Sequence, residues 1–232
     1  MALNALPRGG SKRVMVRAMF DRIAPRYDAM NRLFTAGLDQ RWRRATLAAV
    51  EVGPDDLLLD LACGTGDLSE LAAARGAAVV GLDFAGVMLH YARRRRVKAT
   101  FVQADAAALP LADASVSVVA SGFALRNFVS LEEVFRELAR VLEPGGRIAL
   151  IDVDRPSPGL VRTAHSLYFD RVVPRVGGLL SDSAAYRYLP ESTAYLPPRH
   201  ELLDLLRDAG FRALVHRRLL LGTAQILTGV RG

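Results

Sequence analysis

Short apolar runs alternate with helical patterns through the middle of this sequence, and this alternation limits the fold more than any other feature. The runs with strand character are residues 57–61, 78–82, 100–102, 116–119 and 147–151. Between the last two, apolar side chains from Leu131 to Leu142 recur at spacings of three and four, which indicates an amphipathic helix. Strands and helices in alternation form a mostly parallel sheet with helices on both faces. The sequence therefore predicts the α/β class.

The amphipathic helix has clear start and stop signals. Ser130 precedes it as an N-cap, and Glu132 and Glu133 lie in its first turn, where acidic side chains favour the helix dipole. The Pro-Gly-Gly sequence at residues 144–146 cannot continue a helix. We therefore expect the helix to end there.

The sequence on either side of this core predicts a chain of four parts. They are an N-terminal helical cap, a ligand-binding core, a cover on the substrate side, and a C-terminal helix with a hairpin, at residues 1–50, 51–154, 155–198 and 199–232. The cap has helix breaks at Pro25 and Gly37, and the cover carries six prolines, which indicates short helices and loops. The hairpin has strand character on both sides of Gly222 and is expected to complete the sheet with antiparallel strands.

Composition excludes several classes of protein. No apolar run is long enough to cross a bilayer, and the N-terminus lacks a secretory signal. Cys63 is the only cysteine, so no intrachain disulfide forms and a cytoplasmic location is expected. The net charge is +7 and 29 of the 31 basic residues are arginine, but they are scattered along the chain. The four histidines show no metal-ligand spacing, so no metal is expected.

A glycine-rich turn follows the first strand, at Gly64-Thr65-Gly66. Glycines there permit backbone angles and a close approach of ligand to main chain that side chains would block. The helix that starts near Asp67 presents free N–H donors beside the turn. The position of a third glycine in a dinucleotide fingerprint is Ser69, which makes a pyrophosphate a poorer fit.

Two acidic residues follow the next two strands. Asp83 ends the second strand, where a carboxylate accepts the hydroxyl groups of a ribose. Asp105 follows the strand at residues 100–103 and is placed to accept from an adenine amino group, or else to cap a helix. The carboxyl ends of parallel strands meet at one edge of the sheet, where α/β proteins bind ligands. A nucleoside without pyrophosphate, such as S-adenosylmethionine, fits these groups better than NAD does.

Several motifs resemble those of a known family. Asp-Leu-Ala-Cys-Gly-Thr-Gly-Asp at 60–67, Gly-Leu-Asp-Phe at 81–84 and Leu-Glu-Pro-Gly-Gly at 142–146 are similar to motifs of the class I S-adenosylmethionine-dependent methyltransferases, which have a Rossmann-like sheet. The stretches at 19–31, 125–127 and 186–192 resemble the ubiquinone/menaquinone biosynthesis C-methyltransferase family, in particular its demethylmenaquinone methyltransferases. The likeness covers roughly residues 17–212.

The resemblance implies transfer of a methyl group from S-adenosylmethionine to a ring carbon of a prenylated quinol, from demethylmenaquinol to menaquinol. Together with the two glycines of the turn, it implies cofactor contacts at Gly64, Thr65, Gly66, Asp83, Asp105, Ala106 and Gly122. It places Tyr27, Arg126 and Asn127 beside the substrate. Arg126 would stabilise the oxyanion of the ionised quinol and Asn127 would orient a ring oxygen. The general base is left open between His165, Tyr27 and water.

The sequence departs from the family pattern in places. Phe-Ala-Leu-Arg-Asn at 123–127 stands where the family usually has Phe-Gly-Leu-Arg-Asn, and Asp-Val-Asp-Arg-Pro at 152–156 replaces Glu-Phe-Ser-x-Pro. Val116-Ser117 replaces the usual Phe-Asp before the fourth strand. These changes leave the cofactor contacts intact, but they leave open whether the ring is a naphthoquinol or a benzoquinol.

Other functions stay as alternatives. They are methylation of another small metabolite or lipid, and binding of the cofactor without turnover. A nucleic-acid substrate is disfavoured because no Asn/Asp-Pro-Pro-aromatic tetrapeptide follows the fourth strand and aromatic residues are only 7% of the chain. A prenylated substrate implies peripheral contact with the inner face of the cell membrane, through the N-terminal helices and the cover at 155–198. The oligomeric state is left open, with a homodimer among the options.

Overall fold

The computed structural model describes residues 7–154, 188 and 191–232. The short helices and loops expected in most of the cover, and His165 within it, lie outside the described residues.

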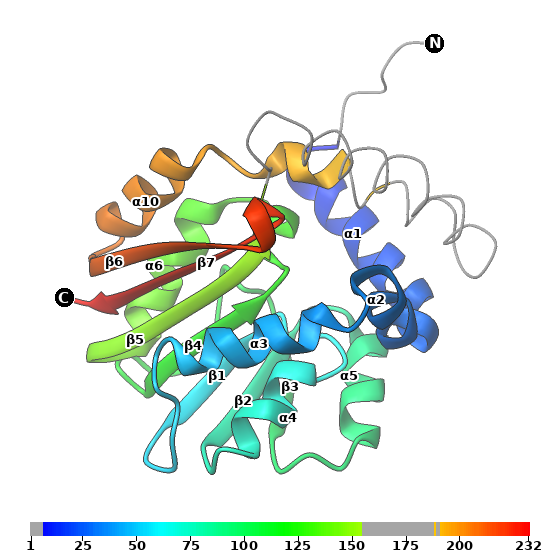
Figure 1. Cartoon of the computed structure of the whole chain (residues 1–232), viewed down its shortest axis with the longest axis horizontal. Helices are drawn as coiled ribbons and strands as arrows, with labels where there is room; N and C mark the ends of the chain where they lie inside the picture. Colours follow the sequence, from blue (N-terminus) through cyan, green and yellow to red (C-terminus); the bar gives the residue numbers. More distant parts are fainter. Residues whose placement is uncertain (1–6, 155–187, 189–190) are drawn as a thin grey trace.

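A single seven-stranded sheet forms the centre of the protein, in the order β3-β2-β1-β4-β5-β7-β6 (Figure 1). The strands are β1 (Leu57–Leu61), β2 (Ala78–Asp83), β3 (Thr100–Gln103), β4 (Val116–Gly122), β5 (Leu142–Val153), β6 (Phe211–Leu219) and β7 (Ala224–Arg231). The first five run parallel, whereas β7 is antiparallel to both of its neighbours. The predicted α/β class, the parallel core and the C-terminal hairpin are confirmed.

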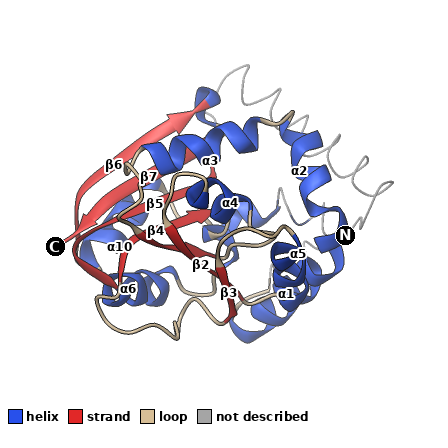
Figure 2. Cartoon of the chain, turned by 90° about the horizontal axis from the view of Figure 1, so that it is seen from below, coloured by secondary structure: helices blue, strands red, loops and turns tan. Residues whose placement is uncertain are grey.

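Helices cover both faces of the sheet (Figure 2). They are α1 (Gly9–Ile23), α2 (Tyr27–Thr35), α3 (Leu38–Ala48), α4 (Asp67–Ala73), α5 (Gly86–Arg94), α6 (Leu131–Val141) and α10 (Arg199–Asp208). Strand residues alternate between the faces, as Leu58 packs with α3 and α4 while Leu59 packs with α6 and α10. A third cluster joins α1 to α5 through Val16, Met19 and Met88. Helix α1 therefore lies beside the carboxyl end of β2, which leads into α5.

The predicted helix signals hold with one correction. Ser130 caps α6, because its hydroxyl oxygen accepts a hydrogen bond from the Glu133 N–H at 3.1 Å. The helix ends at Val141, before the Pro-Gly-Gly sequence, and β5 begins at Leu142 instead of Arg147. Pairing of Leu142 with Val116 in β4 explains the earlier strand, and an irregularity in that register accommodates the extra residues.

The breaks predicted in the N-terminal helices are also confirmed. A short 3₁₀ turn at Ala24–Arg26 contains Pro25 and separates α1 from α2. Gly37, with φ of 76°, separates α2 from α3. In the described part of the chain, no helix is both long enough and apolar enough to cross a membrane.

Packing of α6 against the sheet provides a direct test of the core. Phe135 is fully buried among the side chains of β4, β5 and α10. We expect Phe135→Ala to lower the free energy of unfolding by about 3–5 kcal/mol, because it removes apolar contacts and leaves a cavity. Urea denaturation measures the difference. The exposed neighbour Arg136→Ala is the matched control and is expected to change stability by less than about 0.5 kcal/mol; equal losses in the two variants would contradict this packing.

Candidate active site

A cavity that is partly open to solvent lies at the carboxyl end of the parallel strands. The ends of the first four strands each contribute to its lining, with α1 and the start of α2 on the opposite side. Four of the residues predicted at strand ends lie in this lining: Gly64 after β1, Asp83 at the end of β2, Asp105 after β3 and Gly122 at the end of β4. The structure thus brings together residues spread over about a quarter of the chain.

The glycine turn approaches the cavity with main chain. Gly64 has φ of 57°, and a Cβ atom built on it would lie 3.9 Å from Tyr27 Cε1 across the cavity. Gly66, with φ of 89°, is the N-cap of α4 and faces away from the cavity, toward Ala92 and Phe101. Its role is therefore close packing of the turn against α5 and β3.

Asp83 holds the ends of β1 and β2 together. Its Oδ2 accepts the Gly64 N–H at 2.8 Å, and its Oδ1 accepts the Ala85 N–H at 2.8 Å. Burial raises the pKa of this carboxyl to about 6, so it is ionised at neutral pH. Each oxygen retains further acceptor capacity, which a pair of ribose hydroxyls would use.

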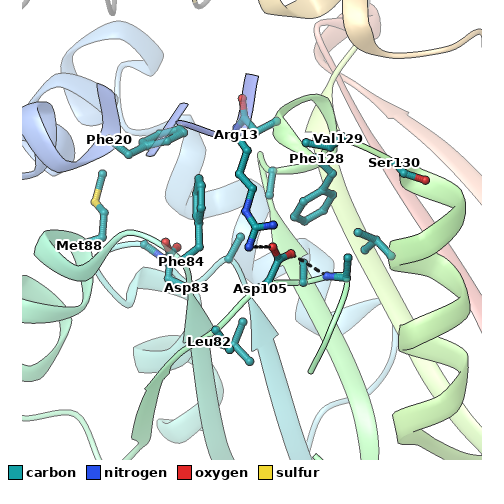
Figure 3. A pocket seen from close by; sticks show the side chains of 18 of the residues that line it. Arg13, Phe20, Leu82, Asp83, Phe84, Met88, Asp105, Phe128, Val129 and Ser130 are labelled. Carbon is teal, nitrogen blue, oxygen red and sulfur yellow. Dashed lines mark hydrogen bonds and ion pairs between the residues drawn. The ribbon is translucent and has the colours of Figure 1, made fainter. Parts of the chain in front are cut away.

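Asp105 lies at the mouth of the cavity, where the Arg13 guanidinium of α1 makes an ion pair with its Oδ2 (Figure 3). Its Oδ1 accepts the Ala107 N–H at 2.9 Å, so this carboxylate shapes a turn and does not cap a described helix. Ala106 lines the cavity beside it. Asp105 therefore lies at the carboxyl edge of the sheet, and Arg13 of α1 lies beside it.

Thr65 is placed differently from the other predicted residues. It is buried and does not line the cavity. Its hydroxyl donates to Asp28 Oδ1 at 2.5 Å, which attaches the glycine turn to α2. Arg95 pairs with the other oxygen of Asp28 and extends the connection to α5.

Tyr27 and Asn127 also line the cavity. The Tyr27 ring lies edge-on to Phe20, with centroids 6.0 Å apart. Burial raises the pKa of Tyr27 above its ordinary value, so its hydroxyl stays protonated at neutral pH. The Asn127 Oδ1 accepts a hydrogen bond from the Tyr188 hydroxyl at 3.1 Å, and this bond connects it to the end of the cover.

Arg126 is buried and does not line the cavity. Its guanidinium pairs with the buried carboxylate of Asp152, donates to Phe123 O at 2.8 Å and donates to Ser192 Oγ at 3.2 Å. These contacts satisfy the guanidinium within the protein, and its charge also acts on Tyr27 in the cavity lining. They fix the loop at residues 123–127, which carries Asn127 into the cavity.

Sequence reasoning missed part of the lining. Phe20, Phe84 and Phe128 surround the space above Asp83, as Figure 3 shows. Phe20 comes from α1, Phe84 directly follows β2, and Phe128 follows the short 3₁₀ turn at Leu125–Asn127, so no single stretch of sequence signals an aromatic wall. Arg13 was missed for the same reason, because only the fold brings α1 to the end of β3.

The comparisons with known proteins agree with this geometry. The family model described as "ubiE/COQ5 methyltransferase family" matches residues 8–231 of this chain. This chain belongs to the ubiE/COQ5 methyltransferase family. It is 44% identical to the demethylmenaquinone methyltransferase of Thermus thermophilus over 92% of this chain and 100% of the relative. It is 40% identical to the ubiquinone/menaquinone biosynthesis C-methyltransferase UbiE of Syntrophotalea carbinolica, over 93% of each chain.

Solved structures of low sequence identity share the fold. A SAM-dependent methyltransferase from Aquifex aeolicus superposes with a TM-score of 0.60 at 16% identity, over 82% of this chain and 89% of that chain. The predicted Rossmann-like class I methyltransferase fold is thereby confirmed, and the family membership predicted from the motifs is confirmed by the sequence comparison. The chain is therefore a methyltransferase of this family.

Asp60, directly behind the glycine turn, generates a prediction about pH. It is fully buried, its Oδ2 accepts the Ser69 hydroxyl at 2.6 Å, and burial raises its pKa to about 7. The native state therefore binds this proton more tightly than the unfolded state, and stability from this group is lost as pH rises from about 4 to about 7. We expect Asp60→Asn to become steadily more stable than the parent protein across that range. Urea denaturation at several pH values measures the difference; a pH-independent difference would contradict it.

Proposed function

We propose that this protein transfers the methyl group of S-adenosylmethionine to a ring carbon of demethylmenaquinol, giving menaquinol. The observation that carries the proposal is the buried, ionised Asp83 beside a glycine turn, at the base of a cavity with an aromatic wall. When bound, the donor supplies an activated methyl group on its sulfonium. The 44% identity to a relative named demethylmenaquinone methyltransferase supports this choice of substrate.

The residues present fit the donor. Asp83 would hold the ribose hydroxyls, because each of its oxygens has spare acceptor capacity. Asp105 and Ala106 would hold the adenine at the end of β3. The Asp105 carboxylate would then accept from the adenine either in place of Arg13 or together with it. Gly64 and Gly122 would lie against the remainder of the donor, since neither has a side chain to block it. Thr65 and Gly66 support this turn from behind.

The substrate would lie beside the aromatic wall, where a planar ring is held in line with the methyl group. Tyr27 keeps its proton at neutral pH, so it acts as a hydrogen-bond donor to the ring oxygen and is not the base. Asn127 would orient the same oxygen. Arg126 acts as a positioning residue, because it fixes the loop that carries Asn127 and does not itself reach the cavity. The quinol proton is then accepted by water or by His165.

A prenylated substrate requires contact with a lipid surface. We propose that the mouth of the cavity meets the inner face of the cell membrane while the protein remains cytoplasmic. Val14 on α1 is 70% exposed and Val129 at the cavity rim is 50% exposed. Arg13 and Arg17 of α1 are also exposed, and Lys12 attaches this helix to Phe128 O. Apolar and basic side chains together favour an anionic bilayer.

We also retain the division into a cap at residues 1–50, a core at 51–154, a cover at 155–198 and a C-terminal part at 199–232 as a proposal. Helix α1 packs on α5, which supports a separate cap for the first helix of residues 1–50. Helix α3, in the same range, packs on the sheet of the core. A homodimer is proposed only as an option for the assembly.

Methyl transfer is tested with isotopically labelled S-adenosylmethionine and a panel of demethylated naphthoquinols and benzoquinols, followed by mass analysis of the lipid phase. We expect the label on the naphthoquinol ring. Asp83→Asn is expected to weaken donor binding roughly 10- to 100-fold, because charged hydrogen bonds to the ribose are lost. Asp113→Asn, which changes an exposed carboxylate far from the cavity, is the matched control. Label found only in water-soluble products would contradict the proposed substrate.

Membrane contact is tested by co-sedimentation with vesicles that contain anionic lipid, at low salt. We expect Val14→Glu and Val129→Glu each to reduce the bound fraction, because each places a charge on the apolar rim. Val215→Glu on β6 is the control, since Val215 is similarly exposed (58%) but lies on the edge strand at the other end of the sheet. Equal reductions in all three variants, or no binding by the parent protein, would contradict the proposed surface.

A further inference from the structure

We infer that Arg43 of α3 binds the α-carboxylate in the methionine part of the methyl donor. The inference rests on the proposed function, since it assigns one group of that donor to a side chain. Nothing in the sequence distinguishes Arg43 from the other 28 arginines.

Arg43 is buried but poorly partnered. The residue is 6% exposed, and its Nε has no hydrogen-bond partner among the described residues. The nearest recorded carboxylate oxygen, Asp67 Oδ2, lies 3.7 Å from that nitrogen. Burial of a guanidinium is costly unless its N–H groups are hydrogen-bonded. The position therefore suits an anion that arrives with a ligand.

Asp67 does not meet this need, because its two oxygens are already used. Arg32 donates to both of them, at 2.9 Å and 2.8 Å. Gln40 donates to Oδ2 at 3.1 Å, and Arg95 contacts Oδ1 at 2.8 Å. A carboxylate offers about four acceptor positions. Arg43 is thus the least satisfied member of this cluster.

The Arg43 guanidinium does not itself line the cavity, but it lies directly behind two residues that do, Gly122 and Phe123. A Cβ atom built on Gly122 would fall 2.5 Å from its Nη1, so the absence of a side chain at Gly122 makes room for it. Its Cζ is 5.2 Å from the centroid of the Phe123 ring, which stacks near it. Gly122 and Phe123 both line the cavity at the end of β4.

The strand order explains why a carboxylate is expected there. The ends of β3, β2, β1 and β4 present Asp105, Asp83, Gly64 and Gly122 in that sequence along the sheet edge. Neighbouring strands are about 4.8 Å apart, so β3 and β4 are separated by about 14 Å, a span suited to an extended adenosyl amino acid. With adenine at Asp105 and ribose at Asp83, the amino-acid end falls beside Gly122. An arginine fork matches a carboxylate in both charge and shape.

The test compares two ligands that differ only in this carboxylate: S-adenosylhomocysteine and its decarboxylated form, S-adenosyl-3-thiopropylamine. Calorimetry measures each affinity in the parent protein and in Arg43→Gln. We expect the substitution to weaken S-adenosylhomocysteine roughly 10- to 100-fold, the loss typical of charged hydrogen bonds, and to leave the decarboxylated ligand unchanged. Arg43→Lys is expected to restore part of the loss. Arg44→Gln, at the exposed next position of α3, is the matched control and changes neither affinity.

Loss of equal size for both ligands, or no loss for either, would overturn the assignment. Failure of the parent protein to bind either ligand would overturn the proposed function itself.

Arg43→Gln is expected to fold, because Asp67 keeps its ion pairs with Arg32 and Arg95. Should thermal unfolding show otherwise, Gly122→Ala provides a second test. Its methyl group displaces Nη1, so it is expected to weaken S-adenosylhomocysteine more than the decarboxylated ligand, and equal effects on both would overturn the assignment.

Discussion

A hydrogen bond of 2.8 Å from the Gly64 N–H to Asp83 Oδ2 connects the turn after β1 to the end of β2. This contact arises from the parallel register, which places Leu61 opposite Leu82 and brings the two chain ends to the same edge. Because the carboxylate is held by main chain, its position does not depend on a flexible partner. The cavity is built around it: the β3 and β4 ends extend the edge on either side, and α1 and α2 close the opposite side.

Long-range arginine pairs hold the helices over this edge. Arg32 and Arg95 both pair with Asp67 at the start of α4, and Arg126 pairs with Asp152 at the end of β5. Several arginines of the chain therefore pair with carboxylates that are themselves buried. Removal of one partner from such a pair is costly, because it leaves a buried charge unpaired. The same consideration makes Arg43, with its unmet Nε, a ligand-binding group.

The sheet and the nucleoside side of the cavity could be predicted from the sequence, because strand periodicity and a glycine turn are local signals. Asp83 and Asp105 followed from their positions just after strands. Arg126 shows where this reasoning stops: its partner Asp152 is 26 residues away, and no local signal in the sequence reports that ion pair. Arg43 gave no signal at all, since its environment is made by α4 and the end of β4. Contacts between distant segments decide such roles, and single motifs do not report them.

The central claim is that the methyl donor lies along the carboxyl edge of β3, β2, β1 and β4. A crystal structure of the protein with S-adenosylhomocysteine tests this most directly. The account predicts adenine beside Asp105, both ribose hydroxyls on the Asp83 carboxylate, and the amino-acid end at Gly122. A ligand bound elsewhere, or bound at this edge with its ribose away from Asp83, would contradict it.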